Sequence, residues 1–145
     1  MSENNEVTAV VPRWFNVASW IALAWNVLGL MAFVAQMAAN PQGLPVEQQA
    51  YYANIPLWAT LGFAAAVIAG TGGCVGLIMR RRWATILFVV SLLGLLVQLT
   101  HGFLIADGLA VFGAGGLIMP LLTTVIAVAL LWLARQAGTR GWLVG

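Results

Sequence analysis

Residues 57–106 have the sequence LWATLGFAAAVIAGTGGCVGLIM RRR WATILFVVSLLGLLVQLTHGFLIA. Arg80-Arg81-Arg82 divides this stretch into two apolar runs, Leu57–Met79 and Trp83–Ala106, and neither run contains Asp, Glu, Lys or Arg. A helix of about 20 apolar residues is long enough to cross the hydrocarbon core of a bilayer. The sequence therefore predicts two membrane-spanning helices joined by a tight arginine turn on the cytoplasmic face.

The composition of the whole chain also indicates a membrane protein. Of its 145 residues, 62% are hydrophobic and 7% are charged, whereas a soluble domain has about 25% charged residues. The arginines are too few and too dispersed for a nucleic-acid surface, and the single Cys74 permits no disulfide within the chain. Metal-ligand spacings, phosphate loops and nucleophile motifs are absent from the sequence, so we expect no cofactor, no metal site and no enzymatic activity.

Turn-forming residues delimit two further spans. Asn40–Pro45 ends the first apolar segment, and Asp107-Gly108 ends the third. A short helix over Val46–Asn54 should lie at the membrane interface, and Pro120 should kink the fourth span. We expect a single all-α domain that consists of an N-terminal tail, 1–12, and four spans, about 16–39, 57–79, 83–106 and 109–134.

The charges fall on two sides of this four-span arrangement. Glu47 and Asp107 lie on one side, and all six basic residues lie on the other: Arg13, Arg80, Arg81, Arg82, Arg135 and Arg140. Loops rich in Lys and Arg stay in the cytoplasm. We therefore predict a multi-pass membrane protein with both termini in the cytoplasm.

Small and polar residues recur along each span at alternating intervals of three and four. This spacing averages 3.5 residues per turn, which is typical of a left-handed antiparallel bundle. Because lipid is as apolar as a leucine side chain, close backbone approach and hydrogen bonds hold such helices together. In the second span, which we predict to be the most closely packed, these residues are Gly62, Ala66, Ala69, Gly73 and Gly76.

The polar residues of the first and third spans match in depth. They predict a polar pocket open to the outside and lined by Asn26, Gln36, Gln98, His101 and Asp107. Buried amides can instead link helices by hydrogen bonds, and a histidine near the interface can be structural, although ionisable residues in spans are functional candidates. For the arginine turn we expect a role in topology and contact with anionic lipid headgroups, with a cytoplasmic partner as the alternative.

Several short motifs resemble a known group of proteins. The matching residues are Leu23–Gly29, Glu47–Tyr52, Pro56–Trp58, Gly72–Gly76, Arg80–Ala84 and Asp107-Gly108. With them the chain resembles small four-span bacterial inner-membrane proteins of unassigned function, some of which are labelled "sugar transporter". The resemblance implies a multi-pass architecture in a bacterial inner membrane, and its motifs name no chemistry. Some of those relatives have an acidic residue near the outer end of the first span, whereas Met31–Val34 here has none.

Two functions remain open at this point. The first is a non-catalytic membrane protein that self-associates or acts as an accessory subunit of a larger complex, with the bilayer and other helices as its partners. The second is a transporter of a small solute, working as an oligomer, with a hydrated pocket at the polar residues. An enzyme is disfavoured because Glu47, His101 and Asp107 do not stand at the spacing of a known acid–base motif.

Overall fold

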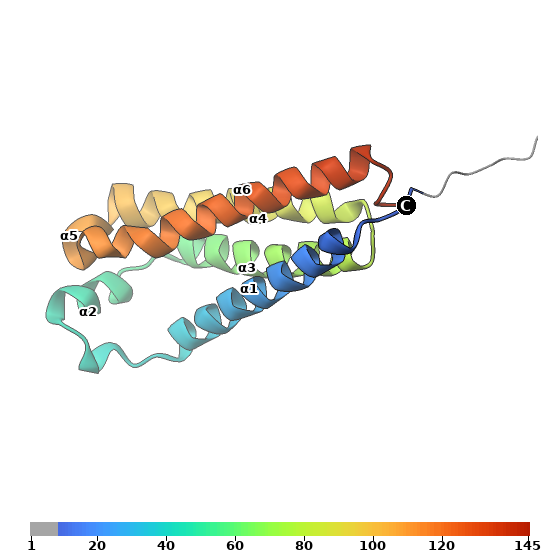
Figure 1. The fold of residues 1–145 in the computed structure, drawn as a ribbon. Helices are drawn as coiled ribbons and strands as arrows, with labels where there is room; N and C mark the ends of the chain where they lie inside the picture. The colour runs from blue at the N-terminus through green and yellow to red at the C-terminus, as the bar shows by residue number, and fades with distance from the viewer. Residues whose placement is uncertain (1–8) are drawn as a thin grey trace, which may run out of the picture.

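The computed structural model describes residues 9–145 as a bundle of helices (Figure 1). Four long helices run side by side: α1 (Arg13–Ala38), α3 (Leu57–Ile78), α4 (Trp83–Leu99) and α6 (Ile118–Thr139). With the turns that extend α4 and α6, all four are long and apolar enough to cross a membrane. The prediction of an all-α bundle with four spans is confirmed. The first eight residues of the predicted tail, 1–12, lie outside the described part of the chain.

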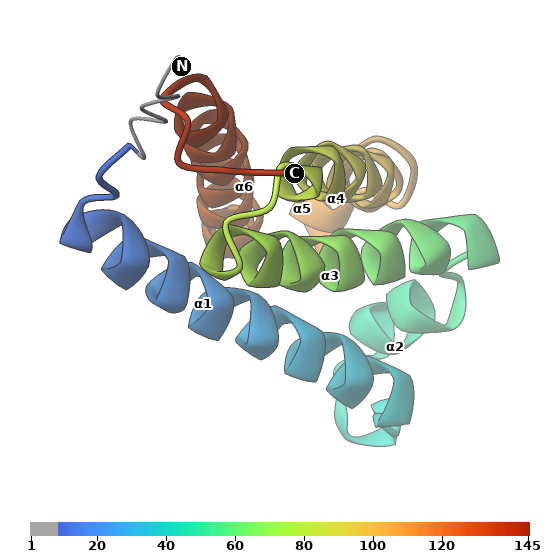
Figure 2. The ribbon, with the colours of Figure 1, turned by 90° about the vertical axis from the view of Figure 1, so that its right-hand side faces the viewer.

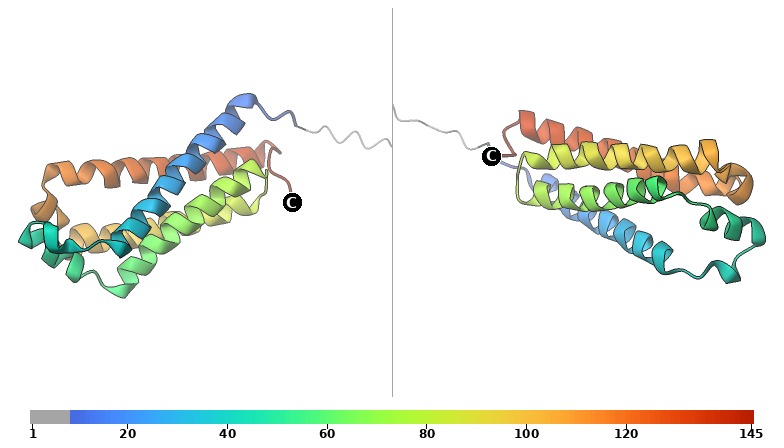
Figure 3. Two further views of the ribbon diagram at one scale, coloured as in Figure 1. Left: turned by 90° about the horizontal axis from the view of Figure 1, so that it is seen from below. Right: turned by 180° about the vertical axis from the view of Figure 1, so that it is seen from behind.

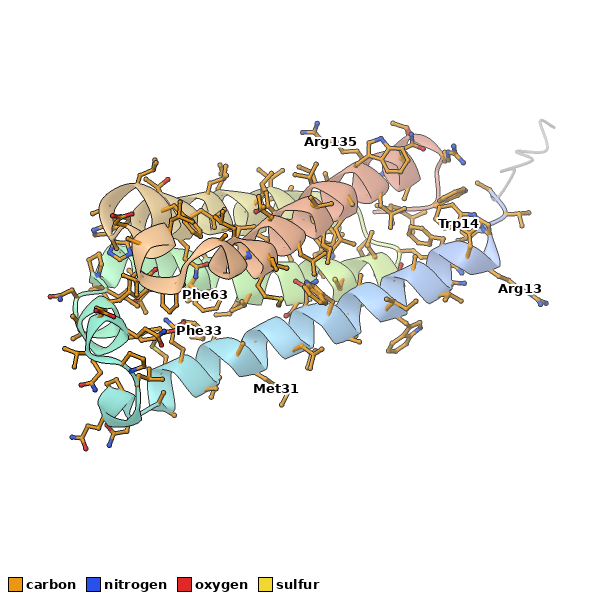
Figure 4. The ribbon with its side chains drawn as sticks, turned by 60° about the vertical axis from the view of Figure 1, so that its left-hand side comes forward. Arg13, Trp14, Met31, Phe33, Phe63 and Arg135 are labelled. Carbon is orange, nitrogen blue, oxygen red and sulfur yellow. The ribbon has the colours of Figure 1, made fainter. Side chains whose placement is uncertain are left out.

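The short elements gather at one end of the bundle, on the left of Figure 1. They are the 3-10 turns Pro41–Gly43 and Ala114–Leu117, the helices α2 (Val46–Ala53) and α5 (Gly108–Phe112), and a π-helical segment, Thr100–Ile105, that continues α4. We call this the α2 end. The opposite end carries the start of α1, the α3–α4 turn and the close of α6, and with them the arginines; Figure 4 shows Arg13 and Arg135 there. We call it the arginine end.

The fourth span differs from its predicted bounds of 109–134, because it runs from Ala114 to Thr139. Gly113 has a φ of 70°, which separates α5 from this span. Pro120, the residue predicted to kink this span, is the third residue of α6, directly after the 3-10 turn Ala114–Leu117 changes to α-helix. Proline is well tolerated in the first turn of an α-helix, because the N–H that it lacks has no partner within that helix. The Pro120 carbonyl accepts a bond from Thr124 Oγ1 at 2.7 Å.

The arginine turn is as tight as predicted. Arg80 has a φ of 56°, and its N–H donates to Leu77 O at 3.0 Å, while Arg81 N–H donates to Gly76 O at 2.8 Å. These two bonds close the C-terminus of α3 as a Schellman motif, in which glycine usually holds the left-handed position. The use of Arg80 there costs about 1–2 kcal/mol.

The four long helices contact one another in the order α1, α3, α4, α6. Figure 2 shows α3 with α1 on one side and α4 on the other, and α6 packs against α4. In Figure 1 and in the right-hand view of Figure 3, α1 and α3 diverge toward α2, whereas the left-hand view of Figure 3 shows them apart at the arginine end as well. Their contacts include Asn26 with Cys74 and Phe33 with Phe63. We call the half of the bundle toward the arginine end, which holds the buried core, the closed half, and the half toward α2, which holds a cavity, the open half.

The hydrophobic core lies in the closed half. Its fully buried large side chains include Phe15 and Leu77, and Leu143 of the C-terminal tail joins them. The tail is tied to the α3–α4 turn, since Val144 N–H donates to Arg80 O at 2.7 Å. Trp142 packs on Phe15 with ring centroids 5.4 Å apart. The tail thus closes the arginine end.

The five residues predicted to pack in the second span are all buried: Gly62, Ala66, Ala69, Gly73 and Gly76. A Cβ on Gly73 would lie 2.8 Å from the Phe88 ring, and one on Gly76 would lie 2.8 Å from the Ala84 Cβ. A Cβ on Gly94 of α4 would lie 2.5 Å from Gly62 O. Close approach of α3 and α4 along their whole length therefore depends on glycine in both helices.

Candidate functional site

A cavity of about 360 Å³ lies between the four long helices. We call it the inner cavity. Its walls are mostly aliphatic and aromatic, with Phe63, Phe88 and Leu95 among them, and every residue that lines it is uncharged. Phe88 and Leu130 also belong to the core at the arginine end. The cavity therefore stops at that core and extends from it toward the α2 end. Ligand pockets in proteins start at about 300 Å³, so the volume suffices for a small molecule.

Two polar side chains at the base of the inner cavity bind the protein itself. Asn26 Nδ2 donates to Ala22 O at 2.9 Å and to Cys74 Sγ at 3.3 Å, and Ser91 Oγ donates to Ala66 O at 2.7 Å. Both lie against Gly70, where a Cβ would collide with Asn26 Oδ1 and would lie 3.0 Å from Ser91 Oγ. Asn26 and Ser91 therefore link α1, α3 and α4 by hydrogen bonds. This is the second of the two roles that were predicted for buried amides.

Two other polar side chains in the inner cavity differ from them. Gln98 of α4 and Thr123 of α6 both line it and are half-buried, and neither side chain has a hydrogen-bond partner among residues 9–145. A polar group in an apolar environment costs free energy unless it is hydrogen-bonded. Within a bilayer core there is no bulk water to satisfy it. Gln98 and Thr123 are thus available to a bound molecule.

A second cavity of about 620 Å³ lies at the α2 end. We call it the end cavity. It is bounded by the last turns of α1, by α2 and by the start of α3, and its polar lining residues are Gln36, Tyr52 and Thr60. Ala32 of α1 lines both this cavity and the inner one. The two cavities therefore lie end to end along α1.

His101 lies in an aromatic cluster at the α2 end. It is 6% exposed, and its ring is 5.5 Å from that of Trp58 and 6.3 Å from that of Tyr51. Tyr51 in turn packs on Phe112 at 5.0 Å, so the cluster joins α2, α3, α5 and the π-helical segment. Burial raises the pKa of the Tyr51 phenol, and the neighbouring Tyr52 raises it further. Tyr51 is therefore a neutral hydroxyl at physiological pH.

The five residues predicted to share one pocket do not lie together. Asn26 and Gln98 line the inner cavity, and Gln36 lines the end cavity. His101 belongs to the aromatic cluster, and Asp107 is exposed in the turn before α5 with a φ of 49°. The prediction of one shared pocket is wrong because it used depth alone. Depth does not include the rotation of each helix about its axis or the divergence of α1 from α3.

Several residues that meet in the structure were not predicted to do so. Thr123 lines the inner cavity, and Tyr51 and Trp58 surround His101. The pairing of Phe33 with Phe63 was not predicted at all. Aromatic residues are common in all four spans, so no local signal distinguishes the ones that meet across helices.

Arg80, Arg81 and Arg82 are exposed at the arginine end. Arg82 Nε donates to Leu143 O at 3.3 Å, so this side chain also holds the C-terminal tail. Among residues 9–145, no three His, Cys, Asp or Glu side chains cluster as a metal site would require.

Comparison of the chain with protein-family models, with curated proteins and with solved structures gives no significant match. The fold and its four apolar helices define the chain as a multi-pass membrane protein. Beyond that class, any function must be argued from the cavities and the helix surfaces.

Proposed function

We propose that this chain is a non-catalytic inner-membrane protein that binds a small neutral molecule in the inner cavity. The observation that carries the proposal is the pair of unpartnered polar side chains, Gln98 and Thr123, in a partly open cavity that is otherwise mostly apolar and in which Asn26 and Ser91 bond to the protein itself. An amide and a hydroxyl can together donate to and accept from one uncharged polar group. The ligand class is a largely apolar molecule with a hydroxyl or carbonyl group.

The absence of charge in the lining supports this ligand class. A charged ligand in the membrane interior would require a charged or strongly polar partner, and the inner cavity offers only neutral groups. Glu47, His101 and Asp107, which could act as acids or bases, do not line the cavity. Binding is therefore proposed without catalysis.

A matched pair of probes tests this function. In vesicles that contain the protein, a diazirine-bearing fatty alcohol and the diazirine hydrocarbon of equal length are photolysed, and the labelled residues are mapped by mass spectrometry. The alcohol should label inner-cavity residues more strongly than the hydrocarbon. One hydrogen bond contributes about 1 kcal/mol, so Gln98→Leu should lower this preference about fivefold.

The control variant is Gln36→Leu, which makes the same chemical change in the end cavity. It should leave the alcohol preference of the inner cavity unchanged. Equal labelling by alcohol and hydrocarbon in the unaltered protein would contradict the proposed function.

A second function, association with another copy or as an accessory subunit of a larger complex, is favoured by a different observation. In the most apolar stretches of α1 and α6 only 11% of residues are buried, compared with 50% in α3. These two helices present their large side chains outward, and Figure 4 shows Met31 pointing away from the bundle. Cross-linking in native membranes followed by purification tests it. A chain that is recovered only as a monomer would exclude this function.

The proposed orientation places both termini in the cytoplasm. Its support is the collection of the arginines at one end of the bundle, since positively charged loops remain on the cytoplasmic side. A reporter fused after Gly145 should be active only in the cytoplasm. Activity in the periplasm would reverse the orientation.

A further inference from the structure

The inner cavity is open along one side of the bundle. Its lining residues on α3 and α4 are all buried or half-buried, so these two helices form its back wall. The exposed lining residues all belong to α1 and α6: Leu28, Ala32 and Met119. Since α1 and α6 stand at the two ends of the packing order, the gap between them forms the opening of the cavity.

The two polar side chains of the inner cavity lie deep within the apolar part of the spans. Gln98 is one helical turn from Gly94, the middle residue of its span, Trp83–Ile105. Thr123 is also one turn from the middle of its span, Ala114–Thr139, and both lie on the α2 side of the middle. One turn rises about 5.4 Å, and a bilayer core about 30 Å thick extends about 15 Å from its centre, so the two side chains lie about 10 Å from the nearest lipid headgroups.

This depth limits the kind of molecule that can bind. A phospholipid has its charged headgroup and its ester groups at the surface of the hydrocarbon core, and moving the charge inward is costly. A water-soluble solute would have to cross the same apolar layer. A lipid whose only polar group is an uncharged hydroxyl or carbonyl can bring that group to Gln98 and Thr123, where both side chains gain hydrogen bonds.

The dimensions of the inner cavity exclude a helix of a second copy as its occupant. On α1 the lining extends over Trp25–Ala32, which is about 10 Å of helix at 1.5 Å per residue. A volume of about 360 Å³ over this length gives a mean cross-section of about 35 Å². A helix with its side chains is about 10–12 Å wide, and its cross-section is more than twice as large. The cavity therefore suits a narrow hydrocarbon chain.

We propose that the ligand of the inner cavity is a bilayer-dissolved lipid with a single uncharged polar group, and that it enters sideways between α1 and α6. Its polar group bonds to Gln98 and Thr123, and its hydrocarbon chain passes between Leu28 and Met119 into the leaflet on the α2 side. The identity of the polar group rests on the proposed function. The lateral route does not, because a hydrocarbon probe tests it without a hydrogen bond.

The experiment measures whether the back wall of the inner cavity can be reached from the bilayer. Vesicles that contain the protein receive one of three diazirine probes: the fatty alcohol, the hydrocarbon of equal length, or a phosphatidylcholine. The alcohol and the phosphatidylcholine have the diazirine near the polar end of the chain, and the hydrocarbon has it at the same carbon. After photolysis, mass spectrometry gives the labelling of the buried Leu95 on the back wall as a fraction of all labelled residues.

The alcohol and the hydrocarbon should both label Leu95. The phosphatidylcholine should label it about fivefold less, because its polar end stays at the membrane surface. Met119→Trp fills the opening and should lower the Leu95 labelling by alcohol and hydrocarbon about fivefold. Ala32→Trp fills it from α1 and serves if Met119→Trp fails to fold. Leu121→Trp, at an exposed position of α6 outside the lining, is the matched control and should leave the labelling unchanged.

Unchanged Leu95 labelling in Met119→Trp and Ala32→Trp would overturn the lateral route, even where the preference for the alcohol stands. Equal labelling of Leu95 by phosphatidylcholine and alcohol would overturn the ligand class, since a charged headgroup would then be accepted. Protection of Leu95 from all three probes would mean that another chain covers the opening, which also overturns the proposal. Loss of the alcohol preference, with hydrocarbon labelling still sensitive to Met119→Trp, would remove the proposed function and keep the lateral route.

Discussion

The two ends of this bundle differ in how completely their interior is filled. Small residues bring α3 and α4 together along their whole length, and aromatic rings meet edge to face at both ends. At the arginine end, Phe15, Leu77 and Leu143 fill the core without exposed surface. At the α2 end, aromatic rings meet edge to face around His101 and between Phe33 and Phe63, and two cavities remain. A membrane bundle without a hydrophobic driving force gains stability from close packing, so the closed half supplies rigidity and the open half supplies space.

Backbone conformation shows the same contrast. Arg80 at the arginine end and Asp107 at the α2 end both have positive φ. Arg80 is fixed by two hydrogen bonds and by the C-terminal tail that binds its carbonyl. Asp107 is exposed between a π-helical segment and a five-residue helix. Short π-helical stretches often occur at functional sites.

The largest loss of stability should follow from removing a buried side chain from the core at the arginine end. Phe15→Ala removes a fully buried ring that packs on Trp142, and it should lower the free energy of unfolding by about 3 kcal/mol. Equilibrium unfolding in detergent measures this. Trp20→Ala, which removes a 60% exposed ring from the same helix, is the matched control and should change the free energy far less. Equal losses for both variants would contradict a core confined to this end.

A somewhat smaller loss should follow from filling space between α3 and α4. A side chain at position 73 meets the Phe88 ring, so Gly73→Leu should cost about 2 kcal/mol and separate the two helices. Thermal unfolding in detergent checks it. Gly138→Leu is the control, because a Cβ at Gly138 meets nothing within 4 Å. An unchanged melting temperature for Gly73→Leu would show that close packing does not stabilise the arginine end.

A substitution in the aromatic cluster around His101 should lower the stability less than these two substitutions at the arginine end. His101→Ala removes two ring contacts, and such contacts contribute about 0.5–1.5 kcal/mol each. We expect a loss of about 1 kcal/mol, with faster hydrogen exchange in α2 and unchanged probe binding in the inner cavity. Loss of that binding would mean that His101 acts on the ligand site in spite of its position outside the lining.

The smallest effect should be a gain at the arginine turn. Arg80→Gly relieves about 1–2 kcal/mol of left-handed strain and loses about 0.5–1 kcal/mol to the greater freedom of glycine in the unfolded chain. The net expectation is a stabilisation of about 0.5 kcal/mol in the same unfolding assay. Asp107→Gly should gain less, because aspartate tolerates this conformation better than arginine. A larger gain at Asp107 would place the greater strain in the open half.

The spans themselves could be predicted almost completely, because length and hydropathy set them. The turn at Arg80–Arg82, the short helix α2 and the burial of Gly62, Ala66, Ala69, Gly73 and Gly76 agree with the sequence pattern. The start of the fourth span was wrong by five residues, since the Asp107-Gly108 turn opens α5 and the span begins only after Gly113. Local turn signals mark where a helix can begin or end, but they do not show which of two neighbouring turns borders the membrane span.

Membrane class, span number and charge distribution were determined by the sequence alone, because the bilayer imposes one length and one polarity on every segment. Which polar side chains share a cavity was decided only by the tertiary structure. Asn26 and Gln98 came together, and Gln36 and His101 did not. The physical reason is that rotation and tilt of each helix arise from contacts such as Gly73 with Phe88 and Phe33 with Phe63, which join residues far apart in the chain.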